Sequence, residues 1–314
     1  MIDYQPLAHT IVIGNQKGGV GKSTNACHLA AALGERGRLV LLIDLDPHAG
    51  ATRHLGVDPS KFAGSLELLT GEETIESLAI REGMPDGVEL IASRTELADL
   101  ESHISKYLDA TRLLEQPLRD ARKSYDYIIL DTPPAARSMP TIAAYSESEW
   151  ILLSAFPHQL SVEGLGEAFR DINDVRQYRN HKLEVLGILL CCVDRRVKKS
   201  RERVEKLVAD AIPGRAMDTS ISQAAVLPES SALGKTLFQR PEQQHHHVRR
   251  QYQRLAAEVE YRIRHRRAFL EGRLDPIGFR IVREIEVLPA PTTPPELSGA
   301  ESAPAKSFLS KLLN

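Results

Sequence analysis

A glycine-rich stretch near the start of the chain, GNQKGGVGKST at residues 14–24, carries residue types that bind nucleotide phosphates. Its second half matches the phosphate-loop pattern G-x-x-x-x-G-K-[ST], in which backbone N–H groups cradle the phosphates. Lys22 would then reach the β- and γ-phosphates, and the Ser23 hydroxyl would bind Mg²⁺. The first glycine of the pattern is replaced by Gln16, and a second lysine, Lys17, follows it. The stretch therefore predicts a phosphate site with one cation more than the usual pattern has.

Aspartates at the ends of predicted strands could complete such a site. In LIDLDPHAGAT (residues 42–52) an apolar run leads into Asp44 and Asp46, and in YDYIILDTPP (residues 125–134) another run ends at Asp131. Carboxylates beside a bound nucleotide hold Mg²⁺ or orient the attacking water. An aspartate that closes a buried strand can instead cap the next turn. The interpretation therefore depends on finding the three motifs together and in order.

Together, the three motifs resemble those of the ParA/MinD family of P-loop ATPases, in which KGGVGKST is a deviant phosphate loop. The resemblance implies that Lys17 reaches across an ATP-sandwich homodimer to the phosphates that the other subunit binds. There it would make charge-assisted hydrogen bonds and stabilise charge in the transition state, as an arginine finger does. The residues expected to bind ATP are Lys17, Gly18, Gly19, Val20, Gly21, Lys22, Ser23 and Thr24.

The same resemblance implies roles for the carboxylates. Asp46 matches the residue that orients or activates the attacking water, and Asp44 supports the site. Ser23 and Asp131 are expected to hold Mg²⁺, the aspartate through water. The expected catalytic residues are Lys17, Lys22 and Asp46. The activity implied is a slow, Mg²⁺-dependent hydrolysis of ATP to ADP and phosphate, stimulated by DNA or a partner protein.

Two details favour the ParA branch of the family, which partitions plasmids, chromosomes or other large cargo. These are NQKGG in the phosphate loop and D-x-D-P in the second motif. Many ParA proteins continue with D-P-Q-G-N, whereas this chain has Asp46-Pro47-His48-Ala49-Gly50. The carboxylates are kept and the residues after them differ. The branch implies a ParB-like or other adaptor protein as partner, and the sequence leaves the cargo open.

DNA binding would have to come from local patches, because the formal net charge is −2. ParA proteins bind DNA non-specifically as ATP dimers, which requires clustered phosphate contacts and no base reading. Two basic segments qualify, 194–206 and 248–269, although charge runs also form ordinary solvated faces. Many relatives have an arginine before the last helix, where this chain has Val226. The residues expected to contact DNA are Arg195, Arg196, Lys198, Lys199, Arg249, Arg250 and Arg254.

The elements that must position these residues alternate along the chain. Strands are predicted at 9–14, 38–45, 88–93, 125–132, 149–156 and 183–192. Helices are predicted between them at 22–36, 94–107, 109–123, 161–179 and 199–211, with a long basic helix over 241–271. This alternation predicts an α/β fold with a mainly parallel, twisted sheet flanked by helices. With the deviant phosphate loop, that is a P-loop NTPase fold.

The end of the chain departs from this pattern. We predict a ParA-like ATPase domain over 1–268, an extended appendage over 269–288 and a disordered Pro/Ser/Ala-rich linker over 289–305. A short amphipathic helix is predicted over 306–314, with one apolar face made of Phe308, Leu309, Leu312 and Leu313. It resembles the membrane-targeting helix of MinD-type relatives. Weak membrane contact, docking on a partner or on this protein, and an inert tail all stay open.

The cysteines bear on compartment and on competing functions. Cys27, Cys191 and Cys192 lack the spacing of a disulfide framework or a Cys-x-x-Cys metal site. They also lack the pattern of an enzyme that bridges an iron–sulfur cluster between subunits. With no secretory leader and no long apolar run, we expect a cytoplasmic, nucleoid-associated protein, partly at the membrane if the tail binds there. Two alternatives stay open: a MinD-like positioning ATPase on a membrane and a dethiobiotin-synthetase-like ligase.

Overall fold

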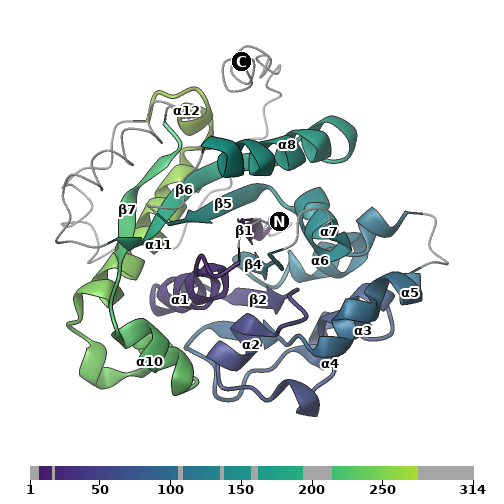
Figure 1. Ribbon diagram of the computed structural model, residues 1–314, viewed down its shortest axis with the longest axis horizontal. Coiled ribbons are helices and arrows are strands. Elements are labelled where there is room, and N and C mark those ends of the chain that lie inside the picture. The colour runs from purple at the N-terminus through teal and green to yellow at the C-terminus, as the bar shows by residue number, and fades with distance from the viewer. Residues whose placement is uncertain are drawn as a thin grey trace, which may run out of the picture.

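A computed structural model gives the structure of most of the predicted ATPase domain (Figure 1). The described residues are 7–15, 18–104, 109–134, 138–156, 162–193 and 214–274, without the side chains of 162–166. Several predicted segments lie outside them: the helix over 199–211, most of the appendage over 269–288, the linker over 289–305 and the terminal helix over 306–314.

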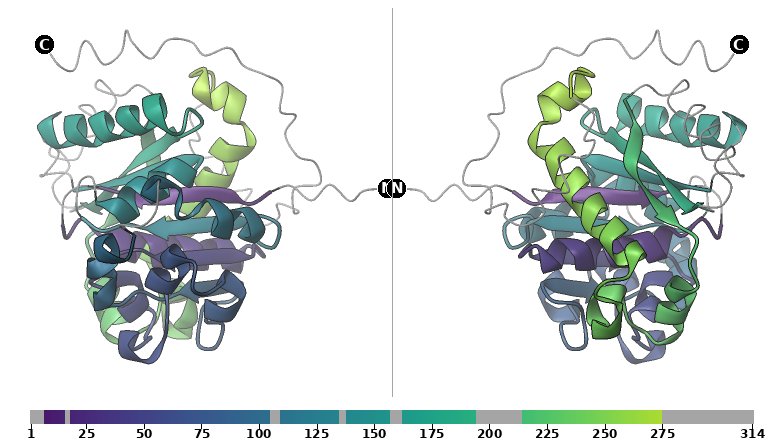
Figure 2. Two further views of the ribbon diagram at one scale, coloured as in Figure 1. Left: turned by 90° about the vertical axis from the view of Figure 1, so that its right-hand side faces the viewer. Right: turned by 90° about the vertical axis from the view of Figure 1, so that its left-hand side faces the viewer.

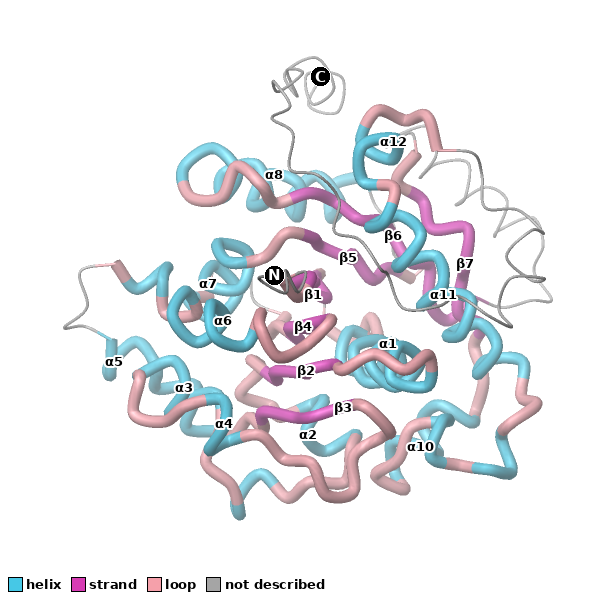
Figure 3. Tube along the Cα trace, turned by 180° about the vertical axis from the view of Figure 1, so that it is seen from behind, coloured by secondary structure: helices cyan, strands magenta, loops and turns pink. Residues whose placement is uncertain are grey.

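A parallel sheet forms the centre of the described part of the chain. Its seven strands are β1 (His9–Gly14), β2 (Val40–Asp44), β3 (Val88–Ile91), β4 (Tyr127–Asp131), β5 (Trp150–Ala155), β6 (Glu184–Val193) and β7 (Ala216–Ser222). Their order across the sheet is β3-β2-β4-β1-β5-β6-β7 (Figure 3). Every neighbouring pair is parallel. The predicted α/β class with a parallel sheet is confirmed, and six of the strands were predicted.

The strands are apolar on both faces because helices cover both. Along β1, Ile11 and Ile13 belong to one apolar cluster and Val12 to another, as the two-residue period of a strand requires. The first cluster includes side chains of α1 (Lys22–Glu35), α2 (Gly50–His54), α10 (Val226–Ala232), α11 (His247–Arg264) and α12 (Arg266–Leu270). On the other face lie α3 (Ser65–Thr70), α4 (Ile75–Leu78), α5 (Leu100–Ile104), α6 (Glu115–Ala121), α7 (Met139–Glu147) and α8 (Val162–Tyr178).

Three predicted helices are shorter than expected because 3₁₀ turns interrupt them. The turns at Thr95–Asp99 and Ala110–Arg112 replace the first parts of the helices predicted over 94–107 and 109–123. The long helix predicted over 241–271 begins with a 3₁₀ turn at Pro241–Gln243, and α11 starts only at His247. The ring of His246 accepts a hydrogen bond from the N–H of Val248 and so caps α11. Among the described residues, no helix has the length and apolarity needed to cross a membrane.

The strand β7 was missed because its sequence, AMDTSIS, contains no continuous apolar run. Its buried side chains alternate instead, at Met217, Thr219 and Ile221. Glu258 of α11 fixes it from one face by accepting hydrogen bonds from the N–H groups of Asp218 and Thr219, each at 2.9 Å. In the right-hand view of Figure 2, α11 runs diagonally across this face of the sheet. A strand at the sheet edge is thus tied to the basic helix.

The apolar core continues slightly past the domain limit predicted at residue 268. Phe269 of α12 is 3% exposed and packs with Trp150 of β5. Leu270 and Leu274 also lie against this cluster. The last described residues therefore belong to the same folded unit as the sheet.

Candidate nucleotide-binding site

The phosphate loop joins the end of β1 to the start of α1. Gly19 and Gly21 have φ values of 74° and 80°, a left-handed conformation in which glycine is not strained. Gly21 is the N-cap of α1, so the free N–H groups of the first helical turn lie at the end of this loop. Such a helix start favours anions, phosphate above all. Gln16 and Lys17 lie outside the described residues.

Lys22, the first residue of α1, is 7% exposed. Burial lowers the pKa of its ammonium group, and the nearby carboxylates of Asp131 and Asp46 oppose that change. Both carboxylates come from loops or strand ends at the same edge of the sheet, because parallel strands end together. The lysine is therefore held among negative charges inside the site.

Asp131, the last residue of β4, is fully buried beside Ile13 of β1 and Asp44 of β2. Neither of its carboxylate oxygens has a hydrogen-bond partner among the described residues. Burial and the neighbouring Asp44 raise its pKa well above the usual range, whereas the nearby Ser23 hydroxyl and Lys22 lower it. A buried carboxylate without partners is costly unless a cation completes it. Asp131 and Ser23 therefore fit a Mg²⁺ ion at this position.

Asp44, at the end of β2, is occupied by donors from its own chain. Its Oδ1 accepts a hydrogen bond from the N–H of Asp46 at 3.1 Å. Its Oδ2 accepts two from Thr52, one from the N–H at 2.8 Å and one from the hydroxyl at 2.7 Å. Burial raises the pKa of Asp44 to about 6, and the hydrogen bonds from Thr52 limit the rise. Asp44 thus anchors the loop after β2 and the start of α2.

Asp46 lies at the mouth of this site, where its side chain is 10% exposed. Its Oδ1 accepts a hydrogen bond from the N–H of His48 at 2.9 Å. The ring nitrogen Nδ1 of His48 lies 2.8 Å from the same oxygen, and the imidazole is 83% exposed. Because a carboxylate only accepts, Nδ1 carries the proton in this contact. A carboxylate facing the phosphate loop is therefore linked to a group at the surface.

Three residues of the site were not predicted from the sequence: His48, Gly50 and Thr52. Gly50 starts α2 so close to α1 that a Cβ on it would lie 2.5 Å from the Ser23 hydroxyl oxygen. A glycine at the start of an element often marks such a close approach. That signal was available in the sequence, whereas the contacts of the other two depend on the loop conformation.

The residues predicted to bind DNA fall into three groups. Arg195, Arg196, Lys198 and Lys199 lie outside the described residues. Arg250 and Arg254 are exposed on α11. Arg249 is 9% exposed; its guanidinium pairs with Glu35 at 2.5 Å and lies over the ring of Phe238. The expectation for Arg249 is therefore corrected: it fastens α11 to α1 and is not part of an open basic surface.

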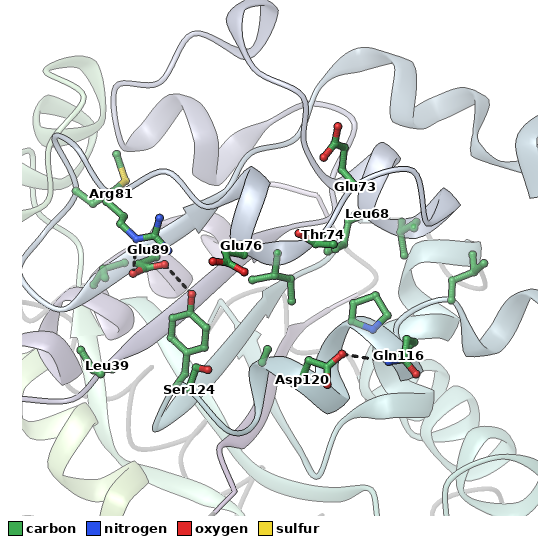
Figure 4. Close-up of a pocket in the computed structure, with 18 of the residues that line it drawn as sticks. Leu39, Leu68, Glu73, Thr74, Glu76, Arg81, Glu89, Gln116, Asp120 and Ser124 are labelled. Atoms are coloured by element: carbon green, nitrogen blue, oxygen red, sulfur yellow. Dashed lines mark hydrogen bonds and ion pairs between the residues drawn. The ribbon is translucent and has the colours of Figure 1, made fainter.

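A cavity of about 1310 Å³ lies at the opposite edge of the sheet, by the amino ends of β2, β3 and β4 (Figure 4). Leu39, Val88 and Tyr125 line it where these strands begin. On its wall, Glu89 accepts hydrogen bonds from the Tyr125 hydroxyl at 2.6 Å and from Arg81 at 2.8 Å. None of the predicted site residues lines this cavity. It is therefore separate from the phosphate site.

Similarity to known proteins covers the whole site. Residues 8–185 match a sequence family described as an AAA domain. The chain is 33% identical over 254 residues to the chromosome-partitioning ATPase Soj of Thermus thermophilus, covering 81% of this chain and 96% of that protein. It is 30% identical over 231 residues to the chromosome partitioning protein ParA of Caulobacter vibrioides, covering 73% and 85%. The fold is also similar to a crystal structure of a cobyrinic acid a,c-diamide synthase from Mycobacterium smegmatis with a bound ATP analogue and magnesium. The TM-score is 0.72 at 27% identity, and the match covers 83% of this chain and 97% of that chain.

Proposed function

Since the chain belongs to the ParA/MinD family of P-loop ATPases, we propose that it hydrolyses ATP with Mg²⁺ and uses the cycle to segregate or position a cargo on DNA. The observation that carries the proposal is the pair of unpartnered, buried oxygens on Asp131, next to Ser23 and Lys22. The carboxylate of Asp131 would bind a metal, and the ammonium of Lys22 would bind phosphates, at the same edge of the sheet.

The residues would divide the chemistry as follows. The loop from Gly18 to Thr24 and the ammonium of Lys22 hold the phosphates. Ser23 and Asp131 hold Mg²⁺, which supplies charge neutralisation at the β- and γ-phosphate oxygens when bound. Asp46 orients the attacking water through the oxygen that His48 leaves open. Lys17 would complete the site from the second subunit of an ATP-dependent homodimer.

DNA contact is proposed for the exposed face of α11. Arg250, Arg254 and Arg264 are exposed, and none of them pairs with a carboxylate of the described residues. At 100° per residue they fall within about 80° of one another, and they span roughly 21 Å along the helix. The two other arginines of α11, Arg249 and Arg262, point into the protein and are paired with Glu35 and Glu258. The three exposed arginines, which we call the α11 stripe, form a row of free cations suited to phosphates.

The partners follow from this assignment. An ATP dimer would present two α11 stripes, which explains why DNA binding should require ATP. A ParB-like or other adaptor would connect the ATPase to a plasmid, a chromosome or a large assembly. The segment 306–314 would contact that partner, the protein itself or, weakly, a membrane. The protein would then reside in the cytoplasm on the nucleoid.

The test measures ATP binding and hydrolysis by the full chain, with and without non-specific DNA. Lys22→Ala should abolish nucleotide binding, and Lys123→Ala, an exposed lysine of the turn after α6, should not. Asp46→Ala should bind ATP, stop hydrolysis and accumulate as a dimer, and Lys17→Ala should bind ATP but hydrolyse it abnormally. Turnover with ATP and Mg²⁺ alone, stimulated by DNA, supports the proposal. Turnover that needs a small-molecule acceptor and ignores DNA would instead indicate a ligase.

A further inference from the structure

The two oxygens of Asp46 are in different situations. Oδ1 accepts from both the backbone N–H and the ring Nδ1 of His48, at 2.9 and 2.8 Å. No described residue donates a hydrogen bond to Oδ2. One oxygen is therefore fixed by the protein, and the other is left to accept from water.

The turn that follows β2 holds this contact in place. The N–H of Ala49 donates to the carbonyl oxygen of Asp46 at 2.8 Å, and Ala49 has a left-handed φ of 55°. Arg53 of α2 donates to the carbonyl oxygen of His48 at 3.4 Å. With its backbone held on both sides, the imidazole reaches back over Asp46 although most of its surface is exposed. The ring is thus both positioned and open to solvent protons.

We propose that His48 is a positioning residue that makes ATP hydrolysis sensitive to pH through its contact with Asp46. This inference rests on the proposed role of Asp46 in orienting water. The neutral ring donates its Nδ1 proton to Oδ1 and turns Oδ2 toward the site. The imidazolium form makes the same hydrogen bond but adds a positive charge, which weakens the attraction of the carboxylate for a water proton. Turnover should therefore fall as His48 gains a proton.

The other charged groups around Asp46 can add their own pH dependence, and burial raises the pKa of Asp44 to about 6. Lys22 of α1 and Asp131 of β4 also lie inside the site, and burial shifts the pKa of each toward its neutral form. Arg53 of α2 stays charged at every relevant pH. Asp44 of β2 accepts its hydrogen bonds whichever residue stands at position 48. Any pH dependence from these groups would persist after His48 is replaced, so substitution at that position isolates the histidine.

His48→Gln supplies the test because glutamine can donate a hydrogen bond but gains no charge near neutral pH. Steady-state hydrolysis is measured with saturating ATP and Mg²⁺ from about pH 8 to about pH 5.5. In the unmodified protein we expect the contact with His48 to add a fall in kcat of up to about fivefold, the size expected for an ion pair at the surface. In His48→Gln this added fall should disappear, leaving only the pH dependence of the other groups, while KM for ATP stays the same. His48→Ala, which also loses the donor, should have a lower kcat at every pH.

His181→Gln is the matched control, because His181 is exposed in the turn before β6, at the amino ends of the strands. It should keep the pH profile of the unmodified protein. The inference is wrong if His48→Gln shows the same fall in kcat as the unmodified protein. Asp46→Ala separates this outcome from a failure of the proposed function. If Asp46→Ala hydrolyses ATP normally, the role of Asp46 itself is wrong; if it is inactive, only the role of His48 fails.

Discussion

Gly50 lies so close to Ser23 that a side chain at position 50 would collide with the hydroxyl proposed to bind Mg²⁺. A Cβ there would be 2.5 Å from the hydroxyl oxygen and 3.1 Å from the Cβ of Ser23. We expect Gly50→Ala to displace the hydroxyl and to weaken the binding of Mg²⁺·ATP about tenfold, a loss of about 1.4 kcal/mol. Titration with a fluorescent ATP analogue, with and without Mg²⁺, measures the change.

A double variant shows whether Gly50 acts through Ser23. In a chain that carries Ser23→Ala there is no hydroxyl to displace. Gly50→Ala should then cost clearly less binding free energy than in the unmodified chain, because the effects of contacting residues do not add. Losses that add in full would mean that Gly50 affects the site by another route.

The spacing of motifs predicts which residues of the site meet, but not how each one is held. Lys22 and Asp131 lie near each other because one follows β1, the other ends β4, and these parallel strands are neighbours. The contact of His48 with Asp46 depends on a turn in which Ala49 takes a left-handed conformation. Alanine does not favour that conformation, so its residue type gives no signal for the turn. This part of the site required the structure.

At the scale of elements, α1 and α11 are joined by a hydrogen bond inside the core. The Tyr252 hydroxyl donates to Oδ1 of Asn25 at 2.8 Å, and the two residues are 0% and 2% exposed. Tyr252→Phe would leave that oxygen buried without this donor. We expect the free energy of unfolding to drop by about 1–3 kcal/mol. Urea denaturation of the full chain measures it, and Tyr261→Phe, half-buried on the same helix, should change it by less than about 0.5 kcal/mol. Equal effects of the two changes would contradict the role given to this hydrogen bond.

The arginines of α11 show what a helical pattern can and cannot predict. Val248, Tyr252 and Val259 define the buried side of the helix. At 100° per residue, Arg250 lies roughly opposite them, so its exposure follows from the sequence. Arg249 lies on the flank, where a long side chain can turn either to solvent or inward. Its inward position depends on Glu35 of α1, a partner that is distant in sequence. Treating all arginines of this segment as one basic patch was therefore wrong for Arg249.

If the α11 stripe binds DNA, reversing its charges should weaken the binding. We expect the double variant Arg250→Glu and Arg254→Glu to lower the affinity of the ATP-bound protein for non-specific DNA. With about six phosphate contacts, affinity of the unmodified protein should also fall roughly 10³-fold between about 50 and 200 mM salt. Fluorescence anisotropy with a labelled duplex measures both effects. The control reverses two exposed arginines on the other face of the sheet, Arg119 of α6 and Arg170 of α8. A loss as large in the control would show that net charge alone, and not the stripe, governs binding.

At the scale of the whole molecule, several buried groups exchange protons when the chain unfolds. Burial, with a contribution from His54, lowers the pKa of His28 to about 3, and burial lowers that of His54 to about 4. The Nε2 of His28 accepts a hydrogen bond from the N–H of Leu237, as only the neutral ring can, whereas the hydrogen bond from its Nδ1 to the carbonyl oxygen of Thr24 opposes the lowering of the pKa. Asp44 acts in the opposite direction, since burial raises its pKa to about 6. As the pH falls, the two histidines lower the free energy of unfolding and Asp44 raises it. The net effect of acid on stability is therefore the difference between these contributions.

Replacing His54 isolates one of these contributions. Its Nε2 is buried and has no hydrogen-bond partner among the described residues, so His54→Leu removes a polar atom that nothing satisfies. Between the unfolded pKa of about 6.5 and the folded value, the unfolded chain binds a proton that the folded chain does not. The stability that depends on this histidine is complete above about pH 6.5 and is lost as the pH falls toward the folded pKa.

From about pH 7.5 to about pH 5 the loss amounts to about 2 kcal/mol. The free energy of unfolding of His54→Leu, measured in urea across this range, should therefore fall by about 2 kcal/mol less than that of the unmodified protein. The control His181→Leu, at an exposed position, should follow the unmodified protein. If the free energy of unfolding of His54→Leu falls with pH as steeply as that of the unmodified protein, His54 is protonated as readily in the folded chain as in the unfolded one.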